Sequence, residues 1–467
     1  MAVIIKTFTT PGGQYVYDRE THSLLRAKSE QEFAAFQRVE TGTATHEDWA
    51  LLDKYVQEGY LKETCLEEII HPETPFIEQY LETRMQQLTL QLGRSCNLRC
   101  SYCSYGGNYK NQRTHSEEVM SLDMIKKCVD FIMQRSRGVD EIAIGLYGGE
   151  SLLHFDSVRE CVKYVQEEYT GRKLHFTITT NGTILTDEII QFLDKHQVNL
   201  SISLDGPKEV HDSNRVFENG EGSFDVIMNN VRYVKENYPE FFKRIYFMTT
   251  VAPGVDLFCI NEFFTADDVL VDSNVRTSTV SSIGARGDVR FDDMYRLTNE
   301  YNRMKVFLAA IGMYSKDKTS KLYTPAIEVI KTFNDSLSKM NIYKHSHPGG
   351  PCLPGIQRPF VDVYGNIFPC ERVSENSEVM KIGHIDTGFD MDKIKAMLNV
   401  GKLSEDECKA CWCFSTCGLC VAFCDGGDSL SHEVRVKNCI GSMNSVYHDL
   451  KTVCLLKEHG YDFLNLK

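Results

Sequence analysis

The sequence predicts an α/β protein with three parts: a small N-terminal module, a central and mainly parallel sheet, and a cysteine-rich C-terminal region. Strand-like and helical segments alternate from about residue 86, which is typical of strand–helix units. Short strand-like pieces followed by helical patterns precede that region, and cysteines at short spacings follow it. Because 467 residues are enough for about three domains, we place these at residues 1–83, 86–310 and 311–467.

The N-terminal part begins with two strand-like pieces, residues 3–6 and 14–17, separated by a Pro-Gly-Gly turn. Helical patterns follow at 30–39 and 46–58. Strands followed by small helices in a unit of this size predict a compact winged-helix-like module. The alternative is an N-terminal cap that only completes the fold of the central domain.

The central part repeats one pattern of strand and helix. Strand-like segments lie at residues 87–92, 141–147, 173–179, 199–204, 244–251 and 274–279. Helical patterns lie at 121–137, 156–169, 187–196 and 223–236. This spacing predicts parallel strands but leaves open whether they form a doubly wound sheet or an incomplete barrel. A helix-rich stretch at 292–340 leads to a break at 347–351, and we expect a loop-rich remainder in which bound metal supplies folding energy.

Composition excludes several classes of protein. The formal net charge of −14 argues against a nucleic-acid partner. The longest apolar runs are far shorter than the ~20 residues of a membrane span, and no secretory signal begins the chain, so we expect a cytoplasmic protein. In a reducing cytosol, 17 cysteines indicate metal or redox chemistry rather than disulfides. Five isolated cysteines are interpreted as small buried hydrophobic residues: Cys65, Cys128, Cys161, Cys259 and Cys454.

The first cysteine cluster follows the first central strand directly. Cys96, Cys100 and Cys103 have the spacing C-x-x-x-C-x-x-C. Three thiolates on one tight loop can hold three irons of a 4Fe–4S cluster, and the fourth iron then stays open to a small molecule. The main rival is a four-cysteine zinc site, but no fourth ligand lies nearby at a spacing typical of zinc.

This cluster resembles the signature of the radical S-adenosylmethionine (SAM) superfamily, in which an aromatic residue, here Tyr102, precedes the third cysteine. The resemblance implies that the open iron chelates SAM and that an electron cleaves SAM to a 5′-deoxyadenosyl radical. It covers about residues 86–290 and implies that the central domain is a partial (β/α)6 TIM-like barrel.

Further motifs at the ends of later strands match the positions at which this superfamily contacts SAM. Gly148-Gly149-Glu150 resembles the motif that binds the SAM amino group. Asn181, and Ser203 with Asp205, resemble positions near the ribose and methionyl parts. Arg215 resembles an arginine directed at the SAM carboxylate, a group that a guanidinium can bind through two hydrogen bonds.

Eight cysteines lie from Cys352 to Cys424, Cys439 follows them, and Gly365 stands between Cys352 and Cys370. This pattern resembles the SPASM extension of radical SAM enzymes, which houses two auxiliary 4Fe–4S clusters. The resemblance implies that the distal cluster is held by Cys408, Cys411, Cys417 and Cys439. The cluster nearer the active site is then held by Cys352, Cys370 and Cys420. The spacing departs from the pattern at Cys420, and Cys424 is a possible fourth ligand of the nearer cluster, while Cys413 has no assigned role. A zinc site at the C-x-x-C pair is the alternative.

Together these resemblances imply three 4Fe–4S clusters, SAM and a precursor peptide as substrate. The N-terminal module resembles a leader-peptide recognition domain, and the region from Cys352 to Arg372 resembles maturases of the sactipeptide and ranthipeptide group. We therefore expect thioether cross-links between cysteine sulfur and carbon, with a flavodoxin- or ferredoxin-like electron donor. The alternatives are formylglycine formation as in sulfatase maturases, carbon–carbon cross-linking or epimerisation of a peptide, and a non-catalytic electron-transfer protein.

Overall fold

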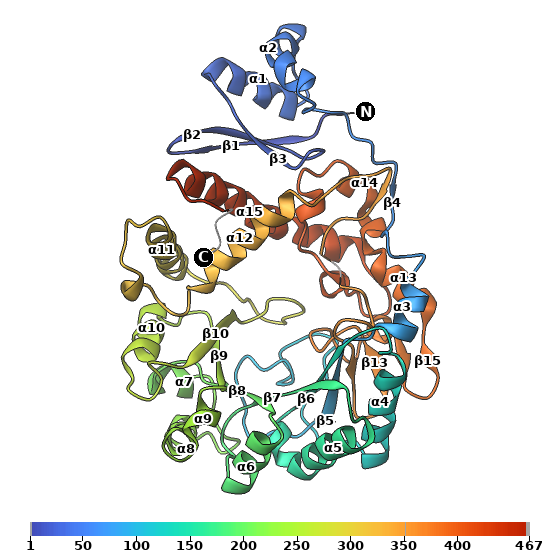
Figure 1. Ribbon diagram of the computed structural model, residues 1–467, viewed down its shortest axis with the longest axis vertical. Helices are drawn as coiled ribbons and strands as arrows, with labels where there is room; N and C mark the ends of the chain where they lie inside the picture. Colours follow the sequence, from blue (N-terminus) through green and yellow to red (C-terminus); the bar gives the residue numbers. More distant parts are fainter. Residues whose placement is uncertain (1, 351, 464–467) are drawn as a thin grey trace.

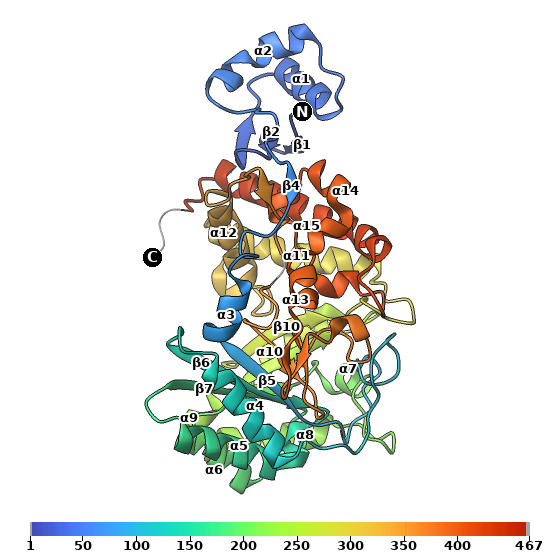
Figure 2. The ribbon, with the colours of Figure 1, turned by 90° about the vertical axis from the view of Figure 1, so that its right-hand side faces the viewer.

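The computed structural model describes residues 2–350 and 352–463. Its N-terminal module holds three antiparallel strands in the order β1-β2-β3, followed by two helices. These elements are β1 (Ile5–Thr10), β2 (Gly13–Asp18), β3 (Ser23–Arg26), α1 (Glu30–Glu40) and α2 (His46–Gln57). The two predicted strands and both helices are confirmed, whereas β3 was not predicted. The module has its own small core, and it lies at the end of the molecule farthest from the large sheet (Figures 1 and 2).

A short linking segment joins this module to the centre of the molecule. It contains β4 (Glu68–Ile69), which pairs in parallel with β11 (His345–Ser346), and α3 (Ile77–Thr83). The segment therefore contacts the C-terminal region before the chain enters the large sheet.

Six parallel strands form the central part of the sheet, in the order in which they occur along the chain. They are β5 (Gln87–Gly93), β6 (Glu141–Gly148), β7 (Lys173–Thr180), β8 (Asn199–Ser203), β9 (Tyr246–Val251) and β10 (Asn274–Thr279). Every predicted central strand is therefore present, and the expectation of a parallel α/β sheet is confirmed. The connections between the strands contain α4 (Leu122–Gln134), α5 (Phe155–Glu168), α6 (Asp187–Lys195), α7 (Lys208–Asp212), α8 (Phe224–Asn237), α9 (Pro239–Phe242) and α10 (Leu257–Ala266).

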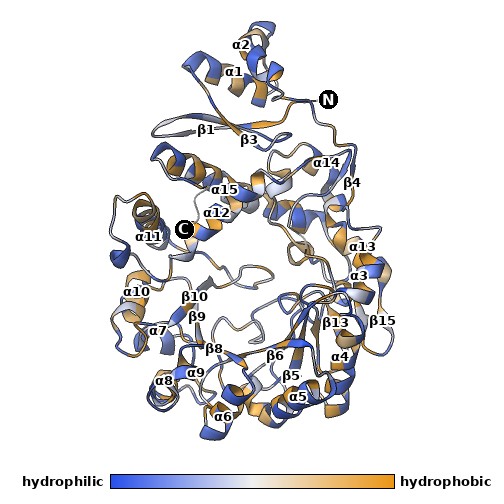
Figure 3. Cartoon of the chain, in the orientation of Figure 1, coloured by the Kyte–Doolittle hydropathy of each residue, from blue (hydrophilic) through white to orange (hydrophobic). Residues whose placement is uncertain are grey.

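The main hydrophobic core lies between the sheet and these helices. Ile125, Val129 and Ile132 of α4 are buried against it, at the three- and four-residue spacing that places side chains on one helix face. Hydrophobic and hydrophilic residues are mixed along each of the outer helices (Figure 3), as expected of helices with one buried and one solvated face. The carboxyl ends of the strands lie outside this core and can therefore carry polar side chains.

The C-terminal region continues the same sheet, which the sequence did not predict. β12 (Phe360–Val361) pairs in parallel with β5, and β13 (Asn366–Phe368), β14 (Gly383–His384) and β15 (Gly388–Phe389) follow in antiparallel order. The helices of this part are α11 (Asp293–Ala310), α12 (Pro325–Leu337), α13 (Met391–Leu398), α14 (Glu405–Lys409) and α15 (His432–Glu458). The pairing with β5 places the C-terminal cysteines beside the central domain.

Two expectations from the sequence are wrong. The C-terminal part is not uniformly loop-rich, because α15 is a single helix of 27 residues. Of the five isolated cysteines, three are buried, but Cys65 and Cys259 are exposed. No helix among the described residues is both long and apolar enough to cross a lipid bilayer.

Candidate active site and cysteine clusters

The first cysteine loop forms one wall of a cavity of about 160 Å³. The loop follows β5, and the other walls come from the ends of the neighbouring strands. The cavity is lined by the predicted residues Cys96, Cys100, Cys103, Gly148, Gly149, Glu150, Asn181, Ser203 and Arg215. Residues from Cys96 to Arg215 thus line one cavity, because parallel strands present their carboxyl ends at the same edge of the sheet.

The two glycines after β6 are required by a close approach to the cysteine loop. Gly148 has a φ of +155°, and a Cβ atom there would lie 2.3 Å from the carbonyl oxygen of Gly93. A Cβ atom on Gly149 would lie 2.1 Å from the carbonyl oxygen of Ser95. The backbone nitrogen of Gly149 instead donates to the Gly93 oxygen at 3.0 Å, so only glycine allows the two loops to meet.

Glu150 presents a buried and rigidly held carboxylate at the edge of the cavity. It accepts hydrogen bonds from the backbone nitrogens of Asn181 at 2.6 Å and Leu152 at 3.0 Å, and from the Thr180 hydroxyl at 2.7 Å. Burial raises the pKa of this carboxyl, which the hydrogen bonds partly offset. A buried carboxylate of this kind gains from a cationic partner, and an ammonium group in the cavity would supply one.

Arg215 is held in place by Asp205 and Tyr102. Its Nε donates to Asp205 Oδ2 at 3.0 Å, and the Tyr102 hydroxyl donates to the same oxygen. The guanidinium lies over the Tyr102 ring, 5.4 Å from its centroid, and Nη1 lies 4.0 Å from Cys100 Sγ. Tyr102 and Asp205 do not line the small cavity, and both contact Arg215, which does. The direct contacts with SAM expected of these two residues stay a prediction.

The sulfur atoms of the first cluster lie in a buried environment with nearby donors. Backbone nitrogens of Leu98 and Tyr105 lie 3.4 Å from the sulfurs of Cys96 and Cys103 respectively. Burial raises the pKa of Cys96 to about 12 and that of Cys100 to about 11. Thiolates at such sites need a cation to stabilise them, and N–H groups directed at sulfur are typical of cluster ligands. The donor set therefore fits a 4Fe–4S cluster that leaves one iron open.

The four cysteines predicted to hold the distal cluster also face one cavity. It has a volume of about 420 Å³, and its lining includes Cys408, Cys411, Cys417 and Cys439. Cys413 lines the same cavity and is buried. The structure thus brings the four predicted thiols to one cavity. Helix α14 carries Cys408 and helix α15 carries Cys439.

The cysteines predicted for the nearer auxiliary cluster are brought together only in part. Cys370 and Cys420 are half-buried and close enough to influence each other, and burial, helped by neighbouring negative groups, raises the pKa of Cys370 to about 11. Cys352 is exposed, and none of the contacts among the described residues joins it to Cys370. Cys424 is fully buried, and its sulfur lies 3.6 Å from Nη1 of Arg435.

A larger cavity of about 910 Å³ lies between the first cysteine loop and the auxiliary region. Tyr102 and Cys103 line it on one side, and Glu371, directly after Cys370, lines it on the other. Glu371 Oε1 accepts a hydrogen bond from Arg358, but Oε2 is buried and has no partner among the described residues. The sequence reasoning did not assign a role to Glu371, although its place directly after a predicted ligand was a usable signal.

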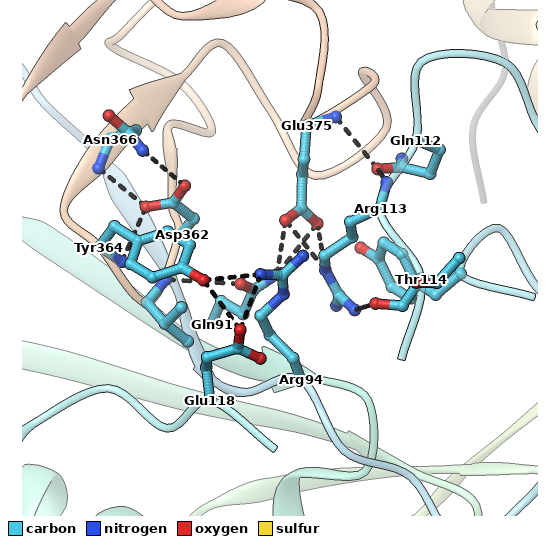
Figure 4. A network of polar contacts seen from close by, with 12 residues as sticks. Gln91, Arg94, Gln112, Arg113, Thr114, Glu118, Asp362, Tyr364, Asn366 and Glu375 are labelled. Carbon is cyan, nitrogen blue, oxygen red and sulfur yellow. Dashed lines mark hydrogen bonds and ion pairs between the residues drawn. The ribbon is translucent and has the colours of Figure 1, made fainter. Parts of the chain in front are cut away.

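A buried polar network holds the walls of this cavity together (Figure 4). Arg113 follows the first cysteine loop, and its Nε donates to Glu375 Oε2 at 2.9 Å. The side-chain nitrogen of Gln91, on β5, donates to both oxygens of Glu375, at 2.9 and 3.0 Å. Arg113 and Glu375 are both buried, and Arg113 also lies 3.5 Å from the centroid of the Tyr105 ring. The ion pair thus fixes the central sheet against the C-terminal region.

Comparison with known proteins agrees with this geometry. The model of the radical SAM superfamily matches residues 90–264. A serine-type anaerobic sulfatase-maturating enzyme of Bacteroides thetaiotaomicron is 31% identical over 147 residues, which is 31% of this chain and 35% of the relative. A cysteine-type anaerobic sulfatase-maturating enzyme of Clostridium novyi is 31% identical over 150 residues, 32% of this chain and 39% of the relative. The radical SAM cyclopropyl synthase TigE of Paramaledivibacter caminithermalis is 25% identical over 169 residues, 34% of each chain.

The matched segments thus span little more than a third of these relatives. Among solved structures, native anSMEcpe with bound AdoMet superimposes with a TM-score of 0.58 at 16% identity, covering 80% of this chain and 99% of that one. The likeness in fold therefore extends well beyond the segment in which the sequences align. The chain contains a radical SAM domain, homologous to that of the anaerobic sulfatase-maturating enzymes.

Proposed function

We propose that this radical SAM enzyme installs thioether cross-links, from cysteine sulfur to carbon, in a precursor peptide. The observation that carries the proposal is the cavity of about 910 Å³ with Cys103 on one wall and the segment after Cys370 on the other. A peptide in this space lies between the SAM site and the nearer auxiliary cysteines. Cys103 lines this space directly, and the nearer auxiliary cysteines adjoin it through Glu371, which follows Cys370.

The residues around the smaller cavity suit SAM. Glu150 offers its buried carboxylate to the ammonium group, and Arg215, held by Asp205, offers a guanidinium to the carboxylate. Cys96, Cys100 and Cys103 would hold the cluster. When bound, SAM and the three clusters supply hydrogen-atom abstraction and electron transfer, while the protein excludes water and orients the groups.

Glu371 is the candidate proton acceptor. Replacing one C–H and one S–H bond by a C–S bond releases a hydrogen atom, a proton and an electron. The cofactors take the hydrogen atom and the electron, so the protein must remove only the thiol proton. Glu371 lines the large cavity, and its buried Oε2 has no hydrogen-bond partner among the described residues, so the carboxylate can accept this proton once a side-chain rotation turns Oε2 toward the substrate.

The N-terminal module supports a peptide substrate. Within the described residues, β3 pairs with no strand other than β2, although the Arg26 carbonyl oxygen at its end accepts a hydrogen bond from the Tyr55 hydroxyl at 3.3 Å. An extended leader segment can add to such an edge through main-chain hydrogen bonds. The module also contacts the distal cysteine loop, because Arg19 Nη1 donates to the carbonyl oxygen of Lys409 at 2.7 Å. A leader bound there is thus tethered to the body of the enzyme.

The second candidate is oxidation of a serine or cysteine to formylglycine. The homology to serine-type and cysteine-type sulfatase-maturating enzymes favours it, and the same cavity would accept that substrate. The β3 edge without a strand partner favours a precursor peptide with a leader instead. Both reactions require cleavage of SAM, so an electron-transfer protein without catalysis is excluded if the reduced enzyme forms 5′-deoxyadenosine.

The test first searches the neighbouring genes for a short cysteine-rich peptide and then incubates that peptide anaerobically with reconstituted enzyme, SAM and reductant. We expect the peptide to lose two hydrogen atoms for each cross-link, with one cysteine protected from alkylation each time. An aldehyde that reacts with a hydrazide would instead indicate formylglycine. Loss of mass with every thiol still alkylated, or no change in mass, would contradict the thioether proposal. The matched control is Cys100→Ala, which removes a ligand of the first cluster and should form neither product nor 5′-deoxyadenosine.

A further inference from the structure

Arg435 lies between the two groups of C-terminal cysteines. It is on α15 and is only 1% exposed. Its Nη1 donates to Cys424 Sγ at 3.6 Å, and its Nε donates to Ser404 Oγ at 2.8 Å. The Ser404 hydroxyl lies 3.3 Å from Cys408 Sγ, one of the predicted distal ligands. Arg435 thus reaches Cys424 directly, and it reaches Cys408 both through the Ser404 hydroxyl and by a side-chain contact of its own.

The other deeply buried arginines of the chain have carboxylate partners. Arg113 pairs with Glu375 at 2.9 Å, and Arg215 pairs with Asp205 at 3.0 Å. Arg19 is likewise paired, with Glu20. The partners of the Arg435 guanidinium, among the described residues, are the Ser404 hydroxyl and the sulfurs of Cys424 and Cys408, and none of them is a carboxylate.

A buried guanidinium without a counter-charge destabilises the folded protein, because the ion loses its hydration in the protein interior. Such a residue is retained where something else supplies the negative charge. A 4Fe–4S cluster with cysteine thiolate ligands carries net negative charge, and that charge, together with hydrogen bonds to its sulfurs, sets its reduction potential. The cysteines on both sides of Arg435 are those expected to hold, or to adjoin, the two auxiliary clusters.

We propose that Arg435 is the shared counter-charge of the two auxiliary clusters and that its positive charge raises their reduction potentials. Arg435 is a positioning residue: it touches no substrate and acts through the sulfurs of Cys424 and Cys408. The inference rests on the two auxiliary clusters of the proposed function. A higher potential makes the auxiliary clusters better acceptors of the electron that each cross-link releases.

The test compares Arg435→Met, which has similar bulk and no charge, with Arg435→Lys, which keeps the charge, and Ser404→Ala, which removes only the orienting hydroxyl. Each full-length protein is reconstituted anaerobically, its iron is counted, and the cluster signals are followed by electron paramagnetic resonance during a redox titration. The signal that changes when SAM is added belongs to the first cluster and serves as the internal reference.

We expect Arg435→Met to shift the auxiliary midpoint potentials to lower values while the reference signal stays unchanged. Arg435→Lys should remain nearer the wild type, and Ser404→Ala should shift less than Arg435→Met. Loss of auxiliary iron from the methionine variant but not the lysine variant would also support the proposal, because the two differ in charge.

Two results would overturn the proposal: unchanged auxiliary potentials in an iron-replete Arg435→Met, or loss of auxiliary iron from Arg435→Lys as well, where the charge is kept. These measurements need no peptide. If the peptide assay fails while the potentials shift as expected, the proposed reaction is wrong and the role of Arg435 stands. If wild-type protein binds only the iron of the first cluster, both proposals fail.

Discussion

The backbone nitrogen of Glu150 donates to the carbonyl oxygen of Ser95 at 2.9 Å. Together with the bond from the Gly149 nitrogen to the Gly93 oxygen, this bond joins the loop after β6 to the end of β5 and to the cysteine loop, one residue before Cys96. It explains why a carboxylate that follows two glycines lies beside three cysteines that are about fifty positions earlier in the sequence. The proposed SAM site is therefore supported by backbone contacts between neighbouring strand ends, which side-chain substitutions elsewhere on the strands should not disturb.

Gly149→Ala should separate these two loops. Its Cβ atom would lie 2.1 Å from the Ser95 carbonyl oxygen, a backbone atom that cannot move aside cheaply. We expect the affinity for SAM to fall at least tenfold, which corresponds to about 1.4 kcal/mol of binding free energy. Isothermal titration with SAM under anaerobic conditions measures this effect.

The control for this substitution is Gly441→Ala, on α15. No atom lies within 4 Å of the Cβ position there, and the residue is helical. Alanine should therefore raise the free energy of unfolding by about 0.5–1 kcal/mol through helix propensity and leave SAM binding unchanged. Equal SAM affinity in the two variants would show that the contact between Gly149 and Ser95 does not shape the site.

Asp205→Ala should lower the free energy of unfolding more than Tyr102→Phe does. Without Asp205, the buried guanidinium of Arg215 loses its carboxylate, and breaking a buried pair in this way lowers the free energy of unfolding by about 3–5 kcal/mol. Tyr102→Phe removes one hydrogen bond and keeps the ion pair, so we expect a loss of about 1 kcal/mol. Chemical denaturation followed by circular dichroism measures both, and equal losses would argue against Asp205 as the main support of Arg215.

The sequence predicted what depends on local pattern. Alternating strands and helices, the spacing of Cys96, Cys100 and Cys103, and the glycines before Glu150 are all encoded within short segments. The parallel sheet then brings those segments to the edge formed by the carboxyl ends of its strands, and this placement does not depend on which side chains pack in the core. The site cysteines and the candidate SAM contacts could therefore be named without a structure, and nine of those residues face one cavity.

Other features depend on contacts between distant residues and could not be read from the sequence. Arg113 and Glu375 form their buried pair across 262 positions, and neither has a local pattern that predicts the other. The helix α15 was missed because it packs against both β1 and α12 and therefore has buried residues on more than one side. An apolar stripe on one face, the usual sign of a helix, is thus absent from it.

Acid should destabilise the protein through His211. Its Nδ1 accepts from the backbone nitrogen of Asp205 at 3.3 Å, so Nε2 carries the proton and donates to Ser223 Oγ at 2.9 Å. Burial, reinforced by the nearby Arg215 charge, lowers the pKa of His211 from 6.5 to about 4. The unfolded chain therefore binds a proton between these values while the folded protein does not. The stability is complete above pH 6.5 and is lost as pH falls toward 4, by at most about 3 kcal/mol.

His211→Asn isolates this contribution, because the asparagine oxygen can still accept from the Asp205 nitrogen and does not titrate. His22 and His347, whose pKa values burial lowers to about 4 and about 3, titrate in both proteins. The free energy of unfolding should thus fall less steeply between pH 6.5 and 4 in the variant than in the wild type. Parallel curves from denaturant titrations at several pH values would rule out His211 as a source of the acid sensitivity.

Glu371→Gln should separate cleavage of SAM from modification of the peptide. The substitution keeps the shape of the side chain and an oxygen for the Arg358 contact, but it removes a base from the wall of the large cavity. General-base catalysis contributes about a hundredfold to ten-thousandfold, so we expect the rate of cross-linking to fall at least a hundredfold. Formation of 5′-deoxyadenosine should persist, because Glu371 is not among the residues that line the smaller cavity.

The control for Glu371→Gln is Glu378→Gln, an exposed carboxylate of the same C-terminal region that pairs with Lys381 and does not line the large cavity. It should cross-link peptide at the wild-type rate. Raising the pH should also partly rescue Glu371→Gln, since a larger fraction of the substrate cysteine is then already deprotonated, with an unperturbed thiol pKa of about 8.5. Rescue by pH would assign the defect to proton removal. A rate that stays low at every pH, with peptide affinity unchanged, would show that Glu371 orients the substrate and does not accept its proton.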